Sequence, residues 1–378
     1  MDLVTRMARR LPRLLADIEE LVACESPSTD PAALARSTDL VADLGERHLG
    51  TAPERLQAGG RTHLRWRLGA GPPRVLVLGH HDTVWPLGSL AARPYEVEGG
   101  VLRGPGCFDM KAGLVIALCA VAGLPDRAGV TVLITGDEEI GSPTSRELIE
   151  STARGCAAAL VFEGAADGGA LKTERKGTSN YVVRAAGRAA HAGLEPERGV
   201  NASIELAHQL LAVSALGDPV LGTTVTPTVL SAGTSTNTVP AAGQFAVDVR
   251  AREVAEQHRV DRELRALHPA LPGSRLAVSG GPNRPPLNAG ASADLYARTI
   301  RLAAELGLDP PGCAAVGGGS DGNFTAGLGV PTLDGLGAVG GGAHADDEHV
   351  LVAQLPARVA LVAALVENLL GSDIDPHG

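Results

Sequence analysis

A short apolar run that ends in three consecutive acids, residues 131–139, constrains this chain more than any other feature. Residues 131–135 are hydrophobic or β-branched on both alternating faces, which is typical of a parallel strand buried on both sides. Asp137, Glu138 and Glu139 then follow at the carboxyl end of that strand, where open α/β sheets place their functional sites. Three adjacent carboxylates repel one another, so we expect a positive charge nearby or full exposure to solvent.

Glu138 and Glu139 also suit metal-assisted hydrolysis. In that chemistry one glutamate binds the metal and its neighbour takes a proton from a metal-activated water molecule. The alternative is a solvated acidic turn that precedes a helix starting near Thr144, where an acid near the helix N-terminus is favourable. The run alone does not decide between the two interpretations, so the rest of the chain must.

Two further apolar runs end in residues that bind metals. Residues 74–79 lead into His80 and Asp82, and residues 157–162 lead into Glu163. A metal-bound histidine usually passes its other N–H to a carboxylate or carbonyl, which is the role that Asp82 suits. Each strand end alone also fits a capped turn with solvated polar residues. Because the carboxyl ends of parallel strands share one sheet edge, the three together favour a metal site.

Asp109 precedes a continuously apolar segment, residues 111–122, that is typical of a buried helix. An aspartate in this place is a good helix N-cap, which is one interpretation. The other is a carboxylate directed into the site from the start of the helix.

Composition excludes several classes of protein. A net charge of −10 and an aromatic content of 2% argue against a nucleic-acid surface. The five cysteines are odd in number and form no CxxC pair, which indicates buried free thiols in a reducing compartment. The first residues lack the apolar stretch of a signal peptide, and no run approaches the ~18 apolar residues of a membrane span. We therefore expect a cytoplasmic protein with no membrane and no nucleic-acid partner.

The chain of 378 residues is long enough for two domains. Between residues 179 and 279 the hydrophobic pattern predicts the order β-α-β-β-α-β, which is the split βαβ unit of ferredoxin-like domains. On either side the pattern is that of an α/β domain. We expect a discontinuous first domain, residues 1–175 and 285–378, and an inserted second domain, residues 176–284.

Short motifs run in one order over nearly the whole chain. They are GHHDTV (79–84), GCFDMKAG (106–113), TGDEEIGS (135–142), FEG (162–164), GRAAHAG (187–193), GVNA (199–202), TNTVP (236–240), GGSD (318–321) and AH (343–344). Through them the chain resembles the di-zinc exopeptidases and amidohydrolases. This family includes glutamate carboxypeptidase of the carboxypeptidase G type, acetylornithine deacetylase, succinyl-diaminopimelate desuccinylase and aminoacylase. Residues 176–202 and 283–288 are most similar to the glutamate carboxypeptidase branch.

The resemblance implies an α/β fold with a zinc-exopeptidase-type catalytic domain. Its central mixed, mostly parallel sheet is flanked by helices, and an inserted ferredoxin-like α+β domain serves as lid and dimerisation domain. It also implies two Zn²⁺ per subunit, with Co²⁺ or Mn²⁺ as substitutes. The implied metal ligands are His80, Asp109, Glu139, Glu163 and His344, with Asp109 bridging both ions.

The resemblance assigns roles to other residues as well. Glu138 is the general base, Asp82 orients His80, and His191 reaches the partner subunit's site to stabilise the oxyanion. Read without the family, His191 also fits an ordinary surface histidine and Arg250 a salt-bridge partner on a strand. The residues implied to bind substrate are Asn237, Arg250, Arg284, Gly318 and Gly319.

Two departures from the family pattern stand out. Glycine at position 164 follows Glu163 where many relatives have proline, and the region around residues 321–324 is more glycine-rich than usual. Neither departure removes a metal ligand, so we expect them to affect the shape of the pocket.

Together these observations predict a metallohydrolase, a zinc-dependent carboxypeptidase that cleaves an amide or peptide bond next to a free carboxylate. One alternative is an N-acyl-amino-acid deacylase that removes acetyl or succinyl groups, because the chemistry is the same and only the recognised side of the amide differs. A second is a non-hydrolytic relative that binds its ligand or transfers an amide. The expected partners are a small amide or peptide substrate and a second copy of the chain.

Overall fold

Two units make up the part of the chain that the computed structural model describes, residues 2–371. Within these residues, the first unit consists of 2–174, Leu287–Val316 and 320–371, and the second of Arg175–Pro286 and Gly317–Gly319. The expected division placed residues 317–319 in the first domain, whereas the structure groups them with the second unit. The catalytic and lid roles of the two units stay predictions.

A six-stranded sheet forms the centre of the first unit, in the order β1-β2-β6-β3-β7-β14. Neighbours among β6, β3, β7 and β14 are parallel, whereas β1 and β2 are antiparallel to their neighbours. The expected mixed, mostly parallel sheet is therefore confirmed. The strands are β1 (Glu54–Ala58), β2 (Arg61–Leu68), β3 (Val75–His80), β6 (Val130–Thr135), β7 (Ala158–Val161) and β14 (Thr332–Leu333).

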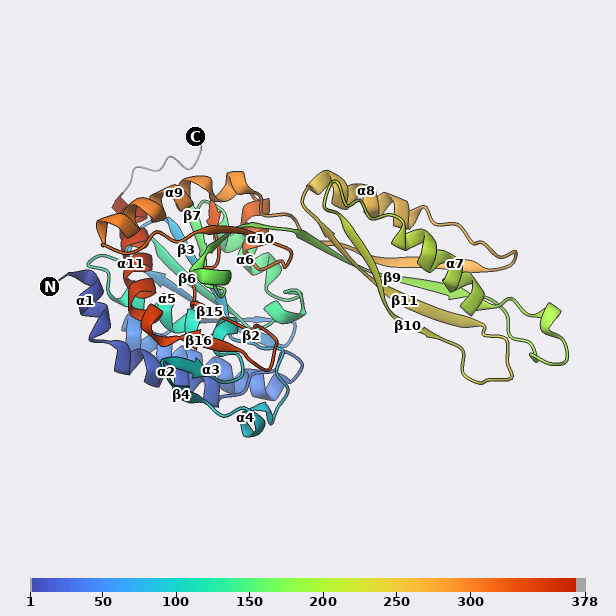
Figure 1. The fold of residues 1–378 in the computed structure, drawn as a ribbon, viewed down its shortest axis with the longest axis horizontal. Coiled ribbons are helices and arrows are strands. Elements are labelled where there is room, and N and C mark those ends of the chain that lie inside the picture. Colours follow the sequence, from blue (N-terminus) through green and yellow to red (C-terminus); the bar gives the residue numbers. More distant parts are fainter. Residues whose placement is uncertain (1, 372–378) are drawn as a thin grey trace. The chain divides into compact units, whose positions relative to one another are not determined.

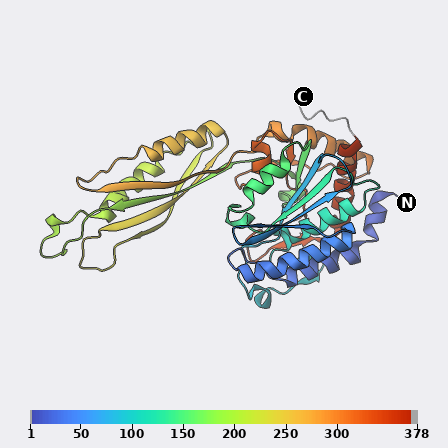
Figure 2. The same ribbon diagram turned by 180° about the vertical axis from the view of Figure 1, so that it is seen from behind.

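Helices cover both faces of this sheet (Figure 2). Alternate residues of β3 show why, because Val75 and Val77 belong to one apolar cluster, and Leu76 and Leu78 to another. Helices α1 (Leu3–Ala8), α2 (Leu11–Ala23), α3 (Pro31–Leu49), α5 (Ala112–Ala122), α9 (Ala289–Glu305) and α11 (Leu355–Gly371) contribute to the first cluster. Helices α6 (Arg146–Ala153) and α10 (Gly322–Gly327) contribute to the second.

The bounds of α3 follow from its sequence. The Asp30 side chain accepts hydrogen bonds from the backbone N–H groups of Ala32 and Ala33, each at 2.9 Å. Pro31 occupies the first helical turn, where its missing N–H costs nothing. Gly50 ends the helix in the left-handed conformation, with φ of 72°.

Helix α5 is buried along nearly its whole length, as its continuously apolar sequence predicts. Its N-cap is Lys111, so Asp109 does not cap this helix. The interpretation of Asp109 as an N-cap is therefore wrong, and its carboxylate serves another purpose.

Residues Val352–Gly371, which include α11, are long and apolar enough to cross a membrane by length and composition alone. The expectation that no run approaches such a span is therefore wrong on those two criteria. In the structure 61% of an apolar 18-residue window in this segment is buried, and its buried hydrophobic side chains belong to the core cluster of the first unit. Burial of this kind is typical of a core helix.

Four short strands form a second sheet in the first unit, in the order β15-β16-β5-β4. The sequence patterns did not predict this sheet, whose strands have only two or three residues each. Its strands are β4 (Glu96–Glu98), β5 (Val101–Arg103), β15 (Gly340–Gly341) and β16 (His349–Leu351). The remaining elements are helix α4 (Ser89–Ala92) and a two-stranded sheet of β8 (Leu171–Arg175) and β13 (Cys313–Val316).

The second unit is a four-stranded antiparallel sheet with two helices (Figure 1). Its elements follow in the order β9, α7, β10, β11, α8 and β12, which confirms the split βαβ prediction. The helices and the sheet share one apolar cluster that includes Val183, Leu206 and Leu264. The elements are β9 (Gly177–Ala186), α7 (Ala202–Ser214), β10 (Thr224–Ala232), β11 (Ala242–Ala251), α8 (Val254–Arg265) and β12 (Arg275–Arg284).

Candidate metal centre

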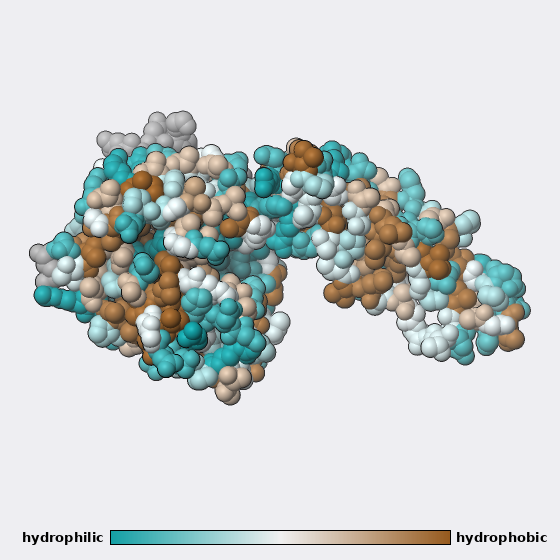
Figure 3. Space-filling view, in the orientation of Figure 1, coloured by the Kyte–Doolittle hydropathy of each residue, from teal (hydrophilic) through white to brown (hydrophobic). Residues whose placement is uncertain are grey.

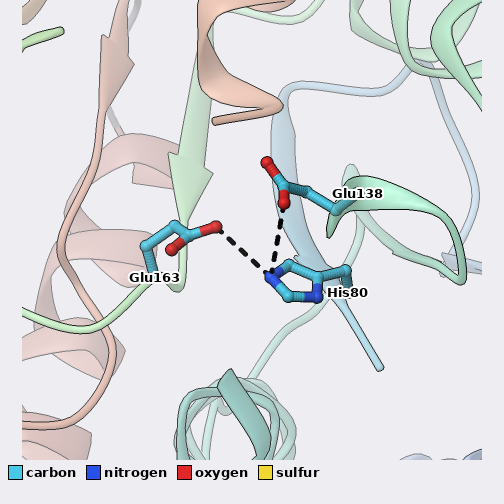
Figure 4. Close-up of side chains that lie close together, drawn as sticks. All are labelled: His80, Glu138 and Glu163. Atoms are coloured by element: carbon cyan, nitrogen blue, oxygen red, sulfur yellow. Dashed lines mark ion pairs between the residues drawn. The ribbon is translucent and has the colours of Figure 1, made fainter. Parts of the chain in front are cut away.

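The register of the parallel strands brings three polar side chains to one sheet edge. His80 of β3 lies opposite Thr135 of β6, and Leu78 lies opposite Val161 of β7. Glu138 and Glu163 follow the ends of β6 and β7, so both carboxylates lie beside the His80 imidazole (Figure 4). His80 Nε2 is 3.4 Å from Glu163 Oε1 and 4.0 Å from Glu138 Oε2.

Asp109 lies between two histidines. Its Oδ1 is 3.4 Å from His80 Nε2, and its Oδ2 is 3.4 Å from His344 Nε2. His344 Nε2 is also 3.1 Å from Glu139 Oε2. One carboxylate that offers a separate oxygen to each imidazole has the geometry of a bridging ligand between two ions.

Three buried atoms in this cluster have no hydrogen-bond partner among residues 2–371. They are His80 Nε2, Asp109 Oδ1 and Glu139 Oε1. Buried polar atoms are nearly always paired, so an unpaired cluster of them needs a reason. Imidazole nitrogen and carboxylate oxygen are donors that Zn²⁺ takes in proteins. The residues therefore fit a metal centre.

The charges of the cluster favour a cation at its middle. Burial lowers the pKa of His80, but contacts with Asp109, Asp82 and Glu163 outweigh it and raise the pKa well above its ordinary value. Asp109 and Glu139 raise the pKa of His344 to about 10. These carboxylates attract positive charge to this point, whether it comes as protons on the histidines or as a metal ion.

Asp82 holds both the histidine and the glutamates in place. The Nδ1–H of His80 donates to the Asp82 carbonyl oxygen at 2.9 Å, which directs the Nε2 lone pair into the cluster. The Asp82 carboxylate accepts the backbone N–H groups of Glu138 and Glu139, each at 3.2 Å. The sequence predicted that Asp82 orients His80. It did not predict the hydrogen bonds by which Asp82 also fixes the turn that carries the two glutamates.

Asp137, the third acid of the run, has a structural role instead of a place in the candidate metal centre. Its carboxylate accepts hydrogen bonds from the backbone N–H of Thr144 at 2.7 Å and the hydroxyl of Ser145 at 2.5 Å.

Sequence reasoning also missed Glu348, a buried carboxylate that contacts the loop bearing Asp109. Its distance of 239 residues from Asp109 leaves no local signal.

The other predicted site residues lie in the second unit. His191 is exposed on a loop, where its Nδ1 accepts the Gly193 N–H at 3.1 Å. The adjacent Ala192 N–H donates to the Asn237 carbonyl at 2.9 Å, so His191 and Asn237 lie on neighbouring segments.

Arg250 makes a two-pronged ion pair with Asp248 at 2.7 and 2.8 Å, as its alternative interpretation predicted. Arg284 is buried, and the carbonyls of Gly318 and Gly319 accept hydrogen bonds from Arg175. The substrate-binding roles assigned to Asn237, Arg250, Arg284 and the two glycines stay predictions.

The structure gives a physical reason for the glycine at position 164. A Cβ atom added there would lie 2.3 Å from Cζ of Phe108, which is far below van der Waals contact. Phe108 is 5% exposed and immediately precedes Asp109. Its ring therefore fills the space that a side chain after Glu163 would need.

Comparison with known proteins decides the family. The model of "Peptidase family M20/M25/M40" matches residues 76–368, which is most of the chain. The chain belongs to this peptidase family. As a member, it is a metallohydrolase that acts on amide bonds and contains a candidate metal-binding group. The predicted resemblance is confirmed.

Individual members of the family match over nearly their whole length. Carboxypeptidase G2 of Pseudomonas sp. (strain RS-16) is 31% identical over 373 residues, which cover 95% of this chain and 89% of that protein. A succinyl-diaminopimelate desuccinylase of Xanthomonas campestris pv. campestris (strain 8004) is 30% identical over 375 residues, 89% of this chain and 96% of that protein. An M20 family metallo-carboxypeptidase from Sulfolobus solfataricus shares the fold, with a TM-score of 0.76 at 16% identity, over 94% of this chain and 99% of that one.

The cluster predicts that a divalent metal ion stabilises the protein. Adding Zn²⁺ to metal-stripped protein, at about a hundredfold excess over its dissociation constant, should raise the melting temperature by roughly 5 °C. His344→Ala should reduce this rise, because it removes one of the two histidines. Asp346→Asn on the same loop is the control and should keep it, because Asp346 is exposed and pairs with Arg93. An equal rise in all three proteins, measured by differential scanning calorimetry, would place the metal elsewhere.

Phe108 and Gly164 should behave as a coupled pair. Gly164→Ala should destabilise the protein by roughly 1–3 kcal/mol, because the new methyl group overlaps the Phe108 ring. In the background of Phe108→Ala the same substitution should cost much less, because the ring is gone. A double-mutant cycle from denaturant unfolding should give a coupling energy above about 0.5 kcal/mol. Additive effects would contradict the steric explanation.

Proposed function

We propose that this protein is a di-zinc carboxypeptidase that hydrolyses an amide bond next to a free carboxylate and releases a C-terminal amino acid. The proposal rests on the position of Glu138. Its Oε2 lies 4.0 Å from His80 Nε2, at the edge of the candidate metal centre. Similarity to carboxypeptidase G2 over 95% of the chain supports the same reading.

The proposed ligands divide into two sets around one shared carboxylate. His80 and Glu163 would hold one ion, His344 and Glu139 would hold the other, and Asp109 would contribute to both. Zn²⁺ suits these nitrogen and oxygen donors, and Co²⁺ or Mn²⁺ can substitute. The distances from Asp109 to the two histidines, 3.4 Å each, support the shared role.

The bound metal pair supplies Lewis acidity, which activates a water molecule and polarises the amide carbonyl. Glu138 takes a proton from the attacking water and returns it to the leaving nitrogen. Asp82 keeps the His80 ring in the orientation that binding requires, and its contacts with two backbone N–H groups hold Glu138 in reach. A donor is also needed for the developing oxyanion, and we assign that role to His191 of a second copy of the chain.

Recognition of the substrate is proposed for the second unit. Arg250 and Arg284 suit a carboxylate, because the planar guanidinium donates to both oxygens at once. In the structure Arg250 already binds the carboxylate of Asp248 in this way, so the substrate must take the place of that partner. Asn237 and the backbone of Gly318 and Gly319 complete the proposed substrate contacts.

A homodimer formed through the second unit is part of the proposal. Strand β10 lies at the edge of its sheet, and edge strands are usually paired or covered. Apolar residues also gather on the surface of this unit (Figure 3). The exposed large apolar side chains of the second unit include those of Ile204, Leu211, Val220, Val229 and Leu230. The net charge of −10 supports an enzyme that binds neither nucleic acid nor anionic membranes. Its free cysteines support a reducing compartment, and we propose the cytoplasm.

The second candidate is removal of an acyl group from an amino acid, which the desuccinylase of Xanthomonas campestris supports at 30% identity. The same metal ligands and base serve both reactions. A substrate panel separates them. It contains peptidyl and N-acyl amino acids with C-terminal glutamate, other C-terminal residues, and N-acetyl or N-succinyl ornithine and diaminopimelate.

Glu138→Gln should lower kcat on the best substrate of this panel by about 100- to 10,000-fold, because the amide cannot carry the proton. Metal content should stay at the wild-type value, because Glu138 is not a proposed ligand. Glu147→Gln on the exposed side of α6 is the control and should keep full activity. An active Glu138→Gln enzyme would overturn the assignment of the base.

Subunit complementation tests the dimer and His191 together. His191→Ala and Glu138→Gln chains should each be nearly inactive alone. Half of the dimers in an equal mixture are hybrids, and each hybrid has one complete site. The mixture should therefore recover about a quarter of wild-type activity. A mixture as inactive as its components, with exchange of subunits verified by mass spectrometry, would show that His191 does not act across the interface.

A further inference from the structure

Glu348 joins two loops that carry metal ligands. It immediately precedes β16, whose His349 lies opposite Arg103 of the antiparallel strand β5. The chain leaves β5 into the loop 104–109, so this register places Glu348 beside the loop that ends in Asp109. The second sheet, which the sequence did not predict, is thus the reason that these distant residues meet.

Among residues 2–371, three of the four hydrogen bonds to the Glu348 carboxylate come from that loop, and the fourth comes from Trp85. Oε1 accepts the backbone N–H groups of Phe108 at 2.9 Å and Asp109 at 3.0 Å. Oε2 accepts the N–H of Gly106 at 2.8 Å and the indole N–H of Trp85 at 2.7 Å. Glu348 is 4% exposed, and four donors fill the lone-pair sites of an ionised carboxylate.

A hairpin connects Glu348 to His344. The backbone N–H of Ala345 donates to the Gly342 carbonyl at 2.9 Å, and that of Glu348 donates to the Ala345 carbonyl at 3.1 Å. Strands β15 and β16 pair on either side of this hairpin. His344 itself has φ of 63°, a left-handed conformation that is uncommon outside glycine and that the surrounding turns must hold.

We propose that Glu348 is a positioning residue that fixes Asp109 relative to His344 and thereby sets the affinity for the metal ion shared by these two ligands. The inference rests on the proposed function, because it concerns the metal pair of that site. Glu348 reaches the backbone of Asp109 directly and His344 through the hairpin. His80 and Glu163 reach the cluster from the ends of β3 and β7, so their ion depends less on Glu348.

The carboxylate cannot be replaced by an amide of the same shape. In Glu348→Gln one oxygen becomes an NH₂ group, which then faces two N–H donors instead of accepting from them. The loop must shift to relieve this contact, and Asp109 shifts with it. Glu348→Asp keeps the charge but shortens the reach, and Trp85→Phe removes one donor while leaving the carboxylate intact. These variants form a graded series.

The experiment measures Zn²⁺ binding to the metal-stripped full-length protein by calorimetric titration with a competing chelator. Wild type should bind two ions. In Glu348→Gln the ion at His344 should bind about 10- to 100-fold more weakly, which is typical for loss of a partner behind a metal ligand. The ion at His80 should weaken less, because of its ligands only Asp109 lies on the displaced loop. Glu348→Asp and Trp85→Phe should weaken the same ion by less. Asp346→Asn is the matched control and should bind both ions as wild type does.

The absorption spectrum of the Co²⁺ form provides a readout that a loss of stability alone does not change. It should change in Glu348→Gln and stay unchanged in Asp346→Asn. Two wild-type affinities in a folded Glu348→Gln variant would overturn the proposal, and so would equal weakening of both ions. A wild-type protein that binds fewer than two ions would also overturn it. Two bound ions without hydrolysis of any amide would instead contradict the proposed function and leave this inference standing.

Discussion

Repulsion among carboxylates at one edge of the central sheet is the constraint on which the site depends. Asp109, Glu139 and Glu163 all lie within 3.4 Å of a histidine nitrogen, in surroundings from which most water is excluded. Buried charges of one sign are stable only when opposite charge pairs with them. Asp82 and Glu348 hold the turns that carry the proposed ligands, because their carboxylates accept backbone N–H groups from those turns. A divalent cation is the charge that suits this arrangement.

The central sheet and the gathering of ligands were predictable because their signals are local. Strands β3, β6 and β7 are buried on both faces, so their sequences are continuously apolar and their ends are easy to find. Parallel pairing then places His80 and Glu163 on one edge by geometry alone. Helix α10 was missed because its sequence, residues 322–327, contains two glycines and resembles a loop.

Residues that act through long-range contacts were not predictable. Glu348 meets Asp109 only because β16 pairs with β5, and strands of three residues leave no periodic pattern. The packing of Phe108 on Gly164 was not predictable for the same reason. The glycine at position 164 departs from the family pattern, and the side chain that explains it is 56 residues away in the sequence (164 − 108). His344 was found through its motif alone, since nothing in its neighbourhood indicates a ligand.

Anomalous diffraction at the zinc absorption edge tests the proposed bridging of two metal ions by Asp109. Crystals of the Zn²⁺-loaded protein should show two peaks about 3.5–4 Å apart, one on each side of the Asp109 carboxylate. One peak should lie against His80 and Glu163, and the other against His344 and Glu139. A single peak, or peaks that avoid Asp109, would contradict the account.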